Sequence, residues 1–538
     1  MAGLAKAFGS GAMTNTIEDL AEANVILAIG TNTTEAHPII GYQMKKAVRE
    51  GGAKIIVADP RRIPLVDFAE VWLELKPGTN VALLNGLMNV ILTEGLADRD
   101  FIAARTEGFE ALEAVLPKYT PDVVEKITGV PAENIRQAAR LYANAERAAI
   151  CYTMGITQHT TGTDNVLAIA NLAMMTGNLG KRGTGVNPLR GQNNVQGACD
   201  VGGLPNVFTG YQPVADEASR EKFEKAWGVV LSGTPGLTLS EVMEKAGEGE
   251  IKALYIMGEN PVVSDPDIDH VKKALDKLDF LVVQDIFLTE TAEFADVVLP
   301  SACFAEKDGT FTNTERRVQR VRKATEAPGG AKPDWQIIAE IGLALRYPMR
   351  YDSAEEIFEE IRSLTPSYAG ISYERLEEGG LHWPCPSAEH PGTPILHTQA
   401  FTRGKGFFSP IEHRASAEEA NVEYPLILTT GRSLWQYHTG TMTRRSEALS
   451  SLAPKSWVEI NPADAAKHDI ADGDEVVLTS RRGCLTSTAM VTEGIREGVV
   501  FMPFHYAESA ANVLTNTAID PVAKIPELKV CAVKLAKA

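Results

Sequence analysis

The chain has 538 residues, of which 44% are hydrophobic and 23% are charged, and its formal net charge is −18. This length provides core for about three or four domains, and the composition is that of an ordinary soluble globular protein. The acidic balance argues against a nucleic-acid partner. No apolar run approaches the roughly 20 residues that a membrane helix requires.

The cysteines argue against a metal cluster held by this chain's own thiols. There are six, all far apart, and none forms a CxxC pair. An iron–sulfur cluster or a zinc ribbon needs closely spaced ligands. The number is too low for a disulfide framework in so long a chain and fits a reducing compartment. No signal or transit sequence begins at Met1, so we expect a cytoplasmic location.

The first recognisable unit is a strand, a polar loop, a helix and a second strand. Asn24–Gly30 (NVILAIG) predicts a buried strand that ends in glycine, and the polar loop Thr31–His37 follows it. The pattern then predicts a helix over Pro38–Glu50 and a strand over Lys54–Ala58, closed by Asp59.

The next part of the chain is predominantly helical. Ala103–Ala145 has a helical pattern that we expect to cover the sheet. A strand-like run, AAICYT, then leads into the loop Met154–Gln158, and Asn165–Thr176 predicts a helix. We expect the loop to face the crevice at the carboxyl ends of the strands.

The segment Gly185–Asp200 (GVNPLRGQNNVQGACD) has no apolar period of 2 or 3.6. This pattern predicts a polar loop rather than a core strand or an amphipathic helix. Its single guanidinium, Arg190, suits a small carboxylate held at two points. The alternative is a structural loop whose amides satisfy neighbouring backbone.

A second unit repeats the first. Ala253–Gly258 predicts a strand, Glu259-Asn260-Pro261 opens the loop, Asp267–Lys277 predicts a helix, and the strand Phe280–Gln284 ends in Asp285. Gly30 and Asp59 are 29 positions apart in the first unit, and Gly258 and Asp285 are 27 apart in the second.

This spacing is typical of a nucleotide half-site, in which the ligand lies beyond the carboxyl ends of parallel strands and against a helix start. An aspartate after the second strand can accept from ribose hydroxyls or guanine N–H groups. Neither unit has GxGxxG, so an ordinary NAD site is poorly supported. Each unit alone could be plain scaffolding with Asp59 and Asp285 as helix caps. Two at similar spacing favour a ligand with two similar nucleotide ends.

The pattern of predicted elements changes in the last third of the chain. Pro333–Tyr347 and Ser353–Ser363 predict helices, and Ala369–Arg403 reads as an irregular connection. After Tyr424, short apolar runs separated by turn residues predict a β-barrel. Its first loop, Gly431–Arg445, combines arginine, histidine and threonine as an anion site would, although a lone histidine is more often structural.

These motifs together resemble the molybdopterin-dependent oxidoreductases, most closely the catalytic subunit of formate dehydrogenases. The resemblance rests on VNPLRGQNNVQGACD, with support from NLAMMTGNLGKRGTGVNP, IMGENP, VVQDIFLTETAEFADVVLP and TTGRSLWQYHTGTMTRR. It implies an α/β fold with two doubly wound, dinucleotide-binding-like sheets around a buried cofactor and a C-terminal barrel of the double-psi type. The implied domains are 1–192, 193–400 and 420–538.

The resemblance implies a bis-(molybdopterin guanine dinucleotide) cofactor with molybdenum or tungsten, and no metal ligand in this chain. Arg190 would orient formate, with Gln192 beside it at the cofactor. The other residues it implies for the cofactor come from both half-sites, from the Met154–Gln158 loop and from the barrel: Gly30, Asn32, His37, Asp59, Arg61, Gly78, Asn80, Met154, Gly155, Gln158, Gly258, Glu259, Asn260, Gln284, Asp285, Thr289, Arg432, His438, Thr439, Asn512 and Lys529.

The sequence departs from the family at its start. The family's [4Fe–4S] segment, its Cys or selenocysteine metal ligand and the adjacent catalytic histidine are not present. We therefore expect the chain to be inactive alone. A gene model interrupted at a selenocysteine codon would give this reading frame, and an in-frame UGA or Cys codon upstream would support that hypothesis. A separate polypeptide could also supply the segment, together with any export signal.

The functional prediction is reversible two-electron oxidation of formate to CO2. The expected partners are electron-transfer subunits of iron–sulfur, flavin/NAD or hydrogenase type, with no nucleic acid and no membrane span. One alternative is a non-catalytic, cofactor-binding scaffold subunit, in which a buried unpaired arginine would be costly. The other is a nitrate-reductase-like enzyme, suggested by the Gly431–Arg445 loop.

Overall fold

A computed structural model describes all residues from 1 to 538. The chain divides into two compact units. Unit 1 comprises Met1–Gly191, Val263–Ile268 and Ile395–Ala538, and unit 2 comprises Gln192–Val262 and Asp269–Pro394. None of the helices is both long and apolar enough to cross a membrane.

Unit 1 is built around a five-stranded parallel sheet. Its strands are almost continuous apolar runs, as expected when helices cover both faces of a parallel sheet. The strand order extends to both sides of the first strand in the sequence, β1. The carboxyl ends of β1 and its neighbour β5 therefore form the switch point where ligands bind in such sheets. In sheet order the strands are β3 (Ala69–Leu73), β2 (Lys54–Ala58), β1 (Val25–Ile29), β5 (Ala148–Tyr152) and β6 (Gly185–Pro188).

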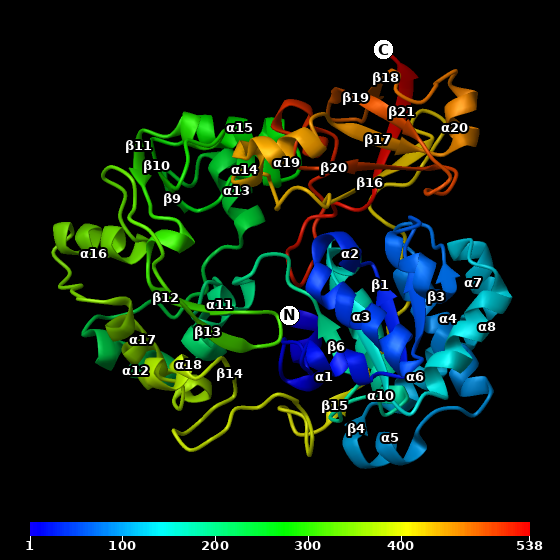
Figure 1. Cartoon of the computed structure of the whole chain (residues 1–538), viewed down its shortest axis with the longest axis horizontal. Coiled ribbons are helices and arrows are strands. Elements are labelled where there is room, and N and C mark those ends of the chain that lie inside the picture. Colours follow the sequence, from blue (N-terminus) through cyan, green and yellow to red (C-terminus); the bar gives the residue numbers. More distant parts are fainter. The chain divides into compact units, whose positions relative to one another are not determined.

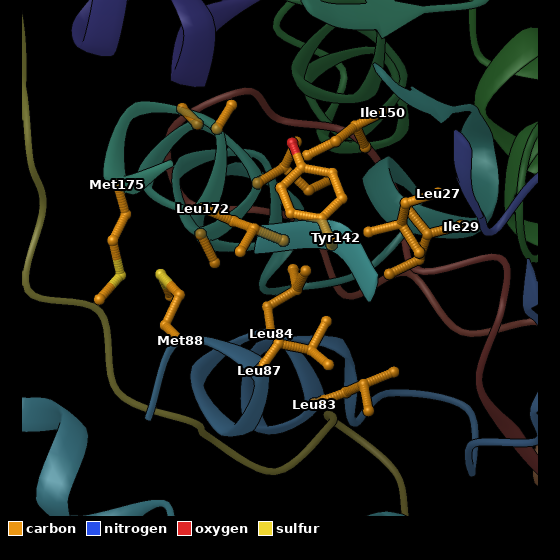
Figure 2. Close-up of a cluster of buried hydrophobic side chains, with 14 of the residues drawn as sticks. Leu27, Ile29, Leu83, Leu84, Leu87, Met88, Tyr142, Ile150, Leu172 and Met175 are labelled. Carbon is orange, nitrogen blue, oxygen red and sulfur yellow. The ribbon is translucent and has the colours of Figure 1, made fainter. Parts of the chain in front are cut away.

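Alternate residues of β1 enter the two hydrophobic layers. Leu27 and Ile29 pack with helices α4 (Asn80–Thr93), α8 (Ala132–Ala143) and α10 (Gly162–Met175), as Figure 2 shows. Ile26 and Ala28 pack on the other face, against residues of α3 (Pro38–Gly51). Burial of such side chains, at about 25 cal/mol per Å2, is the main source of stability.

Residues 426–537 of unit 1 contain the six strands of the predicted barrel, which is closed and is coloured from yellow to red in Figure 1. In barrel order they are β16 (Leu426–Gly431), β20 (Val499–Pro503), β17 (Trp457–Ile460), β19 (Cys484–Val491), β18 (Glu475–Thr479) and β21 (Cys531–Lys537). The other elements of unit 1 are α1 (Ala2–Phe8), α2 (Thr33–Ala36), α5 (Arg99–Arg105), β4 (Thr106–Glu107), α6 (Phe109–Val115), α7 (Pro121–Thr128), α9 (Met154–Thr157), α14 (Pro261–Ser264), β15 (Gly406–Phe407), α19 (Glu447–Leu452) and α20 (Pro462–Lys467).

Unit 2 contains a three-stranded parallel sheet and a three-stranded antiparallel sheet. The parallel sheet has the order β11 (Val297–Pro300), β10 (Phe280–Asp285) and β9 (Ala253–Met257), so the second predicted strand pair is confirmed. The antiparallel sheet has the order β12 (Gly309–Thr312), β13 (Arg317–Val321) and β14 (Leu381–His382). The other elements are α11 (Val195–Asp200), β7 (Val207–Phe208), β8 (Gln212–Pro213), α12 (Glu217–Trp227), α13 (Leu239–Glu248), α15 (Ile268–Asp276), α16 (Asp334–Ala344), α17 (Ala354–Leu364) and α18 (Tyr373–Glu377).

The prediction that Gly185–Asp200 is entirely loop is wrong at both ends. Its first four residues are β6, which pairs with β5 from Ala149↔Gly185 to Tyr152↔Pro188, and its last six are α11. Backbone pairing with β5 satisfies the main chain of β6, and four residues are too few to show a period. Only the stretch around Arg190 remains a loop.

Candidate functional site

The switch point of the first sheet is defined by two glycines in contact. Gly155 donates its N–H to the carbonyl of Gly30 at 3.2 Å, and Thr153 Oγ1 donates to the same carbonyl at 2.7 Å. A Cβ on Gly155 would lie 2.6 Å from Gly30 Cα, and Gly30 has a φ of +56°. These loops can approach so closely only without side chains.

Buried polar atoms without partners gather immediately after Gly30. They are Thr31 Oγ1, both amide atoms of Asn32, Thr34 Oγ1 and His37 Nδ1. Most buried polar groups in proteins have a partner, so a cluster of exceptions indicates a bound polar group. The first half-site therefore fits a ligand rich in donors and acceptors, such as a dinucleotide.

Asp59 and Arg61 follow β2 at the same edge. Asp59 accepts the N–H of Arg61 at 3.0 Å, and burial raises the pKa of its carboxyl to about 6. The Arg61 guanidinium binds Glu459 of β17 at two points, 2.9 Å and 2.5 Å, and lies 3.5 Å from the centre of the Phe501 ring. Arg61, which the resemblance assigns to a dinucleotide, is thus bound to the barrel.

The helix start at α4 and the Met154–Gln158 loop lie next to these residues. Gly78 has a φ of +85°, and a Cβ there would lie 2.2 Å from Ser416 Oγ. Asn80 begins α4 and is 4% exposed, whereas Met154 begins α9 and is 41% exposed. Gln158, at the end of α9, donates its backbone N–H to Met154.

The sequence analysis missed His159, which belongs to the same cluster. Its Nε2 donates to the carbonyl of Gly155 at 2.9 Å and lies 3.4 Å from Asn80 Nδ2. Its Nδ1 is buried without a partner, and burial lowers the pKa of the ring to about 4. The only available signal was its position, one residue beyond the loop Met154–Gln158.

Three basic side chains of the barrel approach this edge. Lys529 Nζ donates to the Thr430 carbonyl at 2.6 Å, and burial lowers its pKa to about 8, against the raising effect of Asp59. Arg432 and Arg61 lower that pKa further because their positive charges are close. His438, with a φ of +53°, has its pKa lowered to about 4 by burial and by Arg432.

The polar side chains of Thr439 and Asn512 contact other residues of unit 1. The hydroxyl of Thr439 lies 3.0 Å from that of Thr441. Asn512 is 1% exposed, and its Nδ2 donates to the carbonyls of Val263 and Ser264 at 3.0 and 2.9 Å. The donors of Asn512 are therefore used to hold the backbone at α14.

Arg190 lies on the loop after β6, at the same edge of the sheet. Its carbonyl accepts from His37 Nε2 at 2.6 Å, and the next carbonyl, of Gly191, accepts from Arg432 Nη1 at 2.9 Å. Burial lowers the pKa of His37, with a further lowering by Arg432. The structure thus brings Arg190, His37 and Arg432 together, while Gln192 is the first residue of unit 2.

The half-site in unit 2 differs from the first. Gly258 has a φ of +64° and open space where a Cβ would stand, and Glu259 is exposed. Asn260 accepts from Thr291 at 2.7 Å and donates to Glu290 at 2.7 Å.

The remaining predicted side chains of this half-site are also bound within unit 2. Gln284 accepts from Tyr255 and donates to Asp334. Asp285 accepts the N–H of the next residue at 2.6 Å, and Thr289 Oγ1 accepts that of Ala292 at 3.2 Å. Of the two half-sites, the first therefore has the buried polar atoms without partners.

A switch point with buried cations, histidines of lowered pKa and buried polar atoms without partners fits a protein that binds a large anionic cofactor. The sequence model of the molybdopterin oxidoreductase family matches residues 3–343, and that of the molydopterin dinucleotide binding domain matches residues 426–532. The chain belongs to the molybdopterin oxidoreductases, and its barrel is the dinucleotide-binding domain of that family.

Several curated relatives span nearly the whole chain. The F420-dependent formate dehydrogenase subunit alpha of Methanocaldococcus jannaschii is 56% identical over 99% of this chain and 79% of its own length. Formate dehydrogenase H of Escherichia coli is 43% identical over 99% and 76%. The assimilatory nitrate reductase catalytic subunit of Bacillus subtilis is 40% identical over 97% and 76%.

A solved structure agrees on the fold. Acetylene hydratase from Pelobacter acetylenicus superposes with a TM-score of 0.78 over 100% of this chain and 80% of its own. Its sequence identity is 21%, so the likeness supports the architecture alone.

Proposed function

We propose that the protein is the large-subunit portion of a formate dehydrogenase and that Arg190 holds the substrate carboxylate. The observation that carries this proposal is the position of Arg190, on the strand-end loop that two side chains of the cofactor-binding region hold by its backbone. The 56% identity to a formate dehydrogenase alpha subunit supports the same substrate.

A planar guanidinium can hold both carboxylate oxygens of formate and so turn its C–H bond in one direction. Its permanent charge attracts the anionic substrate to the edge of the sheet, where Lys529 and Arg432 are also positive. His37 and His159 already donate their Nε2–H to backbone carbonyls, so each offers its Nδ1 as an acceptor. Burial lowers the pKa of all three histidines, His37, His159 and His438, which disfavours further positive charge here. These roles are binding and orientation.

The proposed cofactor is bis-(molybdopterin guanine dinucleotide) with molybdenum or tungsten. When bound, it supplies the two-electron chemistry. The first dinucleotide would meet Asn32, His37 and Asp59, whose buried polar groups fit it, together with Gly30, Arg61, Gly78 and Asn80. Met154, Gly155 and Gln158 would line the metal pocket, and the barrel residues would reach the pterin and phosphate groups. The second would meet Gly258, where the backbone is open.

We further propose three domains at 1–192, 193–400 and 420–538, a cytoplasmic location and separate electron-transfer subunits. The six free cysteines lack cluster spacing, so an iron–sulfur cluster would need other ligands. The name of the Methanocaldococcus jannaschii relative, which specifies an alpha subunit, supports a multi-subunit enzyme.

The first test uses the protein purified from its native host with its associated subunits. We expect bound pterin, guanine nucleotide and molybdenum or tungsten, and formate-dependent reduction of a viologen dye. Arg190→Ala should lower kcat/KM for formate by about a thousandfold or more, because a charge-assisted two-point contact is lost, with pterin content unchanged. Unchanged formate kinetics in Arg190→Ala would remove Arg190 from this role.

Nitrate reduction is the second candidate, favoured by the 40% identity to a nitrate reductase. The same preparation, supplied with nitrate and reduced viologen, separates the two. Dye oxidation by nitrate without dye reduction by formate would replace the proposed function. Bound pterin with neither activity would favour a scaffold subunit.

A further inference from the structure

The loop with Arg190 continues the pairing of the central sheet for one residue and then leaves it. β6 pairs with β5 as far as Tyr152↔Pro188, and Leu189 donates its N–H to the Tyr152 carbonyl at 2.9 Å. The carbonyls of Arg190 and Gly191 lie beyond the last strand pairing and need other donors.

The first of these donors is His37. It lies between α2 and α3, immediately before Pro38, and its Nε2 is 2.6 Å from the carbonyl of Arg190. A carbonyl can only accept, so Nε2 carries the hydrogen. His37 Nδ1 is buried without a partner, and burial lowers the pKa of the ring, so the neutral Nε2–H form is favoured.

The second donor is Arg432 of the barrel. Its Nη1 donates to the Gly191 carbonyl at 2.9 Å. A Cβ on Gly191 would lie 2.8 Å from Arg432 Nη2, so an alanine at this position would force the guanidinium to shift. Two elements far apart in sequence therefore bind consecutive carbonyls of one loop.

We propose that His37 and Arg432 are positioning residues that clamp the backbone of Arg190 and Gly191 and thereby fix the direction of the Arg190 guanidinium. This proposal rests on the proposed function only in naming formate as what Arg190 holds. The clamp itself consists of two hydrogen bonds to backbone carbonyls and does not depend on the identity of the substrate. A loop held at both carbonyls keeps the guanidinium ordered before substrate arrives, which reduces the entropy lost on binding.

The test combines hydrogen–deuterium exchange of peptides covering residues 185–192 with formate kinetics, on the natively purified protein. His37→Ala should speed exchange of this segment about tenfold, the value of one hydrogen bond, and raise KM for formate more than it lowers kcat. His37→Gln keeps a side-chain N–H donor and should restore much of both. Gly191→Ala, which displaces Arg432 while His37 remains, should also speed exchange.

His159→Ala is the matched control, because it removes the same kind of histidine-to-carbonyl bond from the Gly155 loop. It should speed exchange at residues 154–160 and leave residues 185–192 unchanged. Unchanged exchange at 185–192 in both His37→Ala and Gly191→Ala would overturn the clamp, and so would loss of pterin from His37→Ala with unchanged exchange. If Arg190→Ala leaves formate kinetics unaltered, the proposed function fails, and the exchange result still decides the clamp.

Discussion

At the scale of single residues, the two half-sites are chemically unequal. Thr31, Asn32 and His37 keep buried polar atoms without partners in the first half-site. Asn260 and Gln284 of the second are bound to neighbouring side chains. A buried unsatisfied group costs about 1–3 kcal/mol, so the first half-site gains most from a ligand that satisfies it.

Gly155→Ala is expected to damage the switch point. Its Cβ would meet backbone atoms of Gly30 at 2.6 Å, which no side-chain rotation can relieve. We expect a loss of about 1–3 kcal/mol in the free energy of unfolding and a lower pterin content. Urea unfolding and pterin fluorescence measure the two effects.

Gly309→Ala is its control, because a Cβ on Gly309 meets nothing within 4 Å. It should change the free energy of unfolding by about 0.5 kcal/mol or less. Equal behaviour of the two variants would contradict the close approach of the two loops.

The buried histidines predict a pH dependence. Burial lowers the pKa values of His159, His438 and His505 to about 4, from an ordinary 6.5. Between these values the unfolded chain binds protons that the folded chain does not, so stability rises with pH across this window. Asp59 has the opposite effect on stability up to about pH 6. Its pKa is raised from the ordinary 3.8 to about 6, so the folded chain binds a proton that the unfolded chain has already lost.

Each of these three histidines should therefore contribute stability that increases with pH between about pH 5 and pH 6.5, measured as the urea midpoint of the cofactor-free chain at each pH. His159→Gln should reduce the slope by up to about 1.4 kcal/mol per pH unit, the contribution of one proton. A slope that His159→Gln does not change would show that this ring titrates normally in the folded chain.

At the scale of elements, strand prediction succeeded where buried runs were long enough to read. The strand predicted at Lys54–Ala58 is β2, and the strand predicted at Phe280–Gln284 is β10, which extends one residue further, to Asp285. β21 (Cys531–Lys537) is interrupted by Lys534 and ends in Lys537, so its apolar residues form no continuous run. β6 was missed because Asn187, a polar residue at 0% exposure, breaks the apolar run.

The placement of the candidate residues was predictable to the extent that glycines and charged residues end strands. Gly30 and Asp59 were placed in this way, and both lie at one edge of the first sheet. Arg190, chosen as the only guanidinium of a predicted polar loop, lies after β6 at the same edge. Contacts across the fold were not predictable. No local pattern indicates that Arg61 binds Glu459, almost 400 residues away, or that His37 binds the carbonyl of Arg190.

At the scale of the whole molecule, contacts between the barrel and the first sheet make unit 1 a single body. Arg61 binds Glu459 of the barrel, and Arg62 donates its N–H to the carbonyl of Gly494 at 2.7 Å. Arg496 donates to the Glu74 carbonyl at 2.6 Å. Asp520 accepts from the backbone and side chain of Thr163, at 2.9 and 2.8 Å, at the start of α10. The basic groups of the barrel are thereby held at the switch point.

The pair Arg61–Glu459 should be central to this attachment, because its side chains are only 16% and 11% exposed. Glu459→Gln removes one charge at constant volume and leaves the Arg61 guanidinium buried beside Phe501. We expect a loss of about 3–5 kcal/mol, measured by urea unfolding of the full chain. Glu70→Gln, which breaks the exposed pair with Lys54 at 52% and 38% exposure, should cost about 0–1 kcal/mol. Similar losses in both variants would mean that the barrel is attached mainly by its backbone contacts.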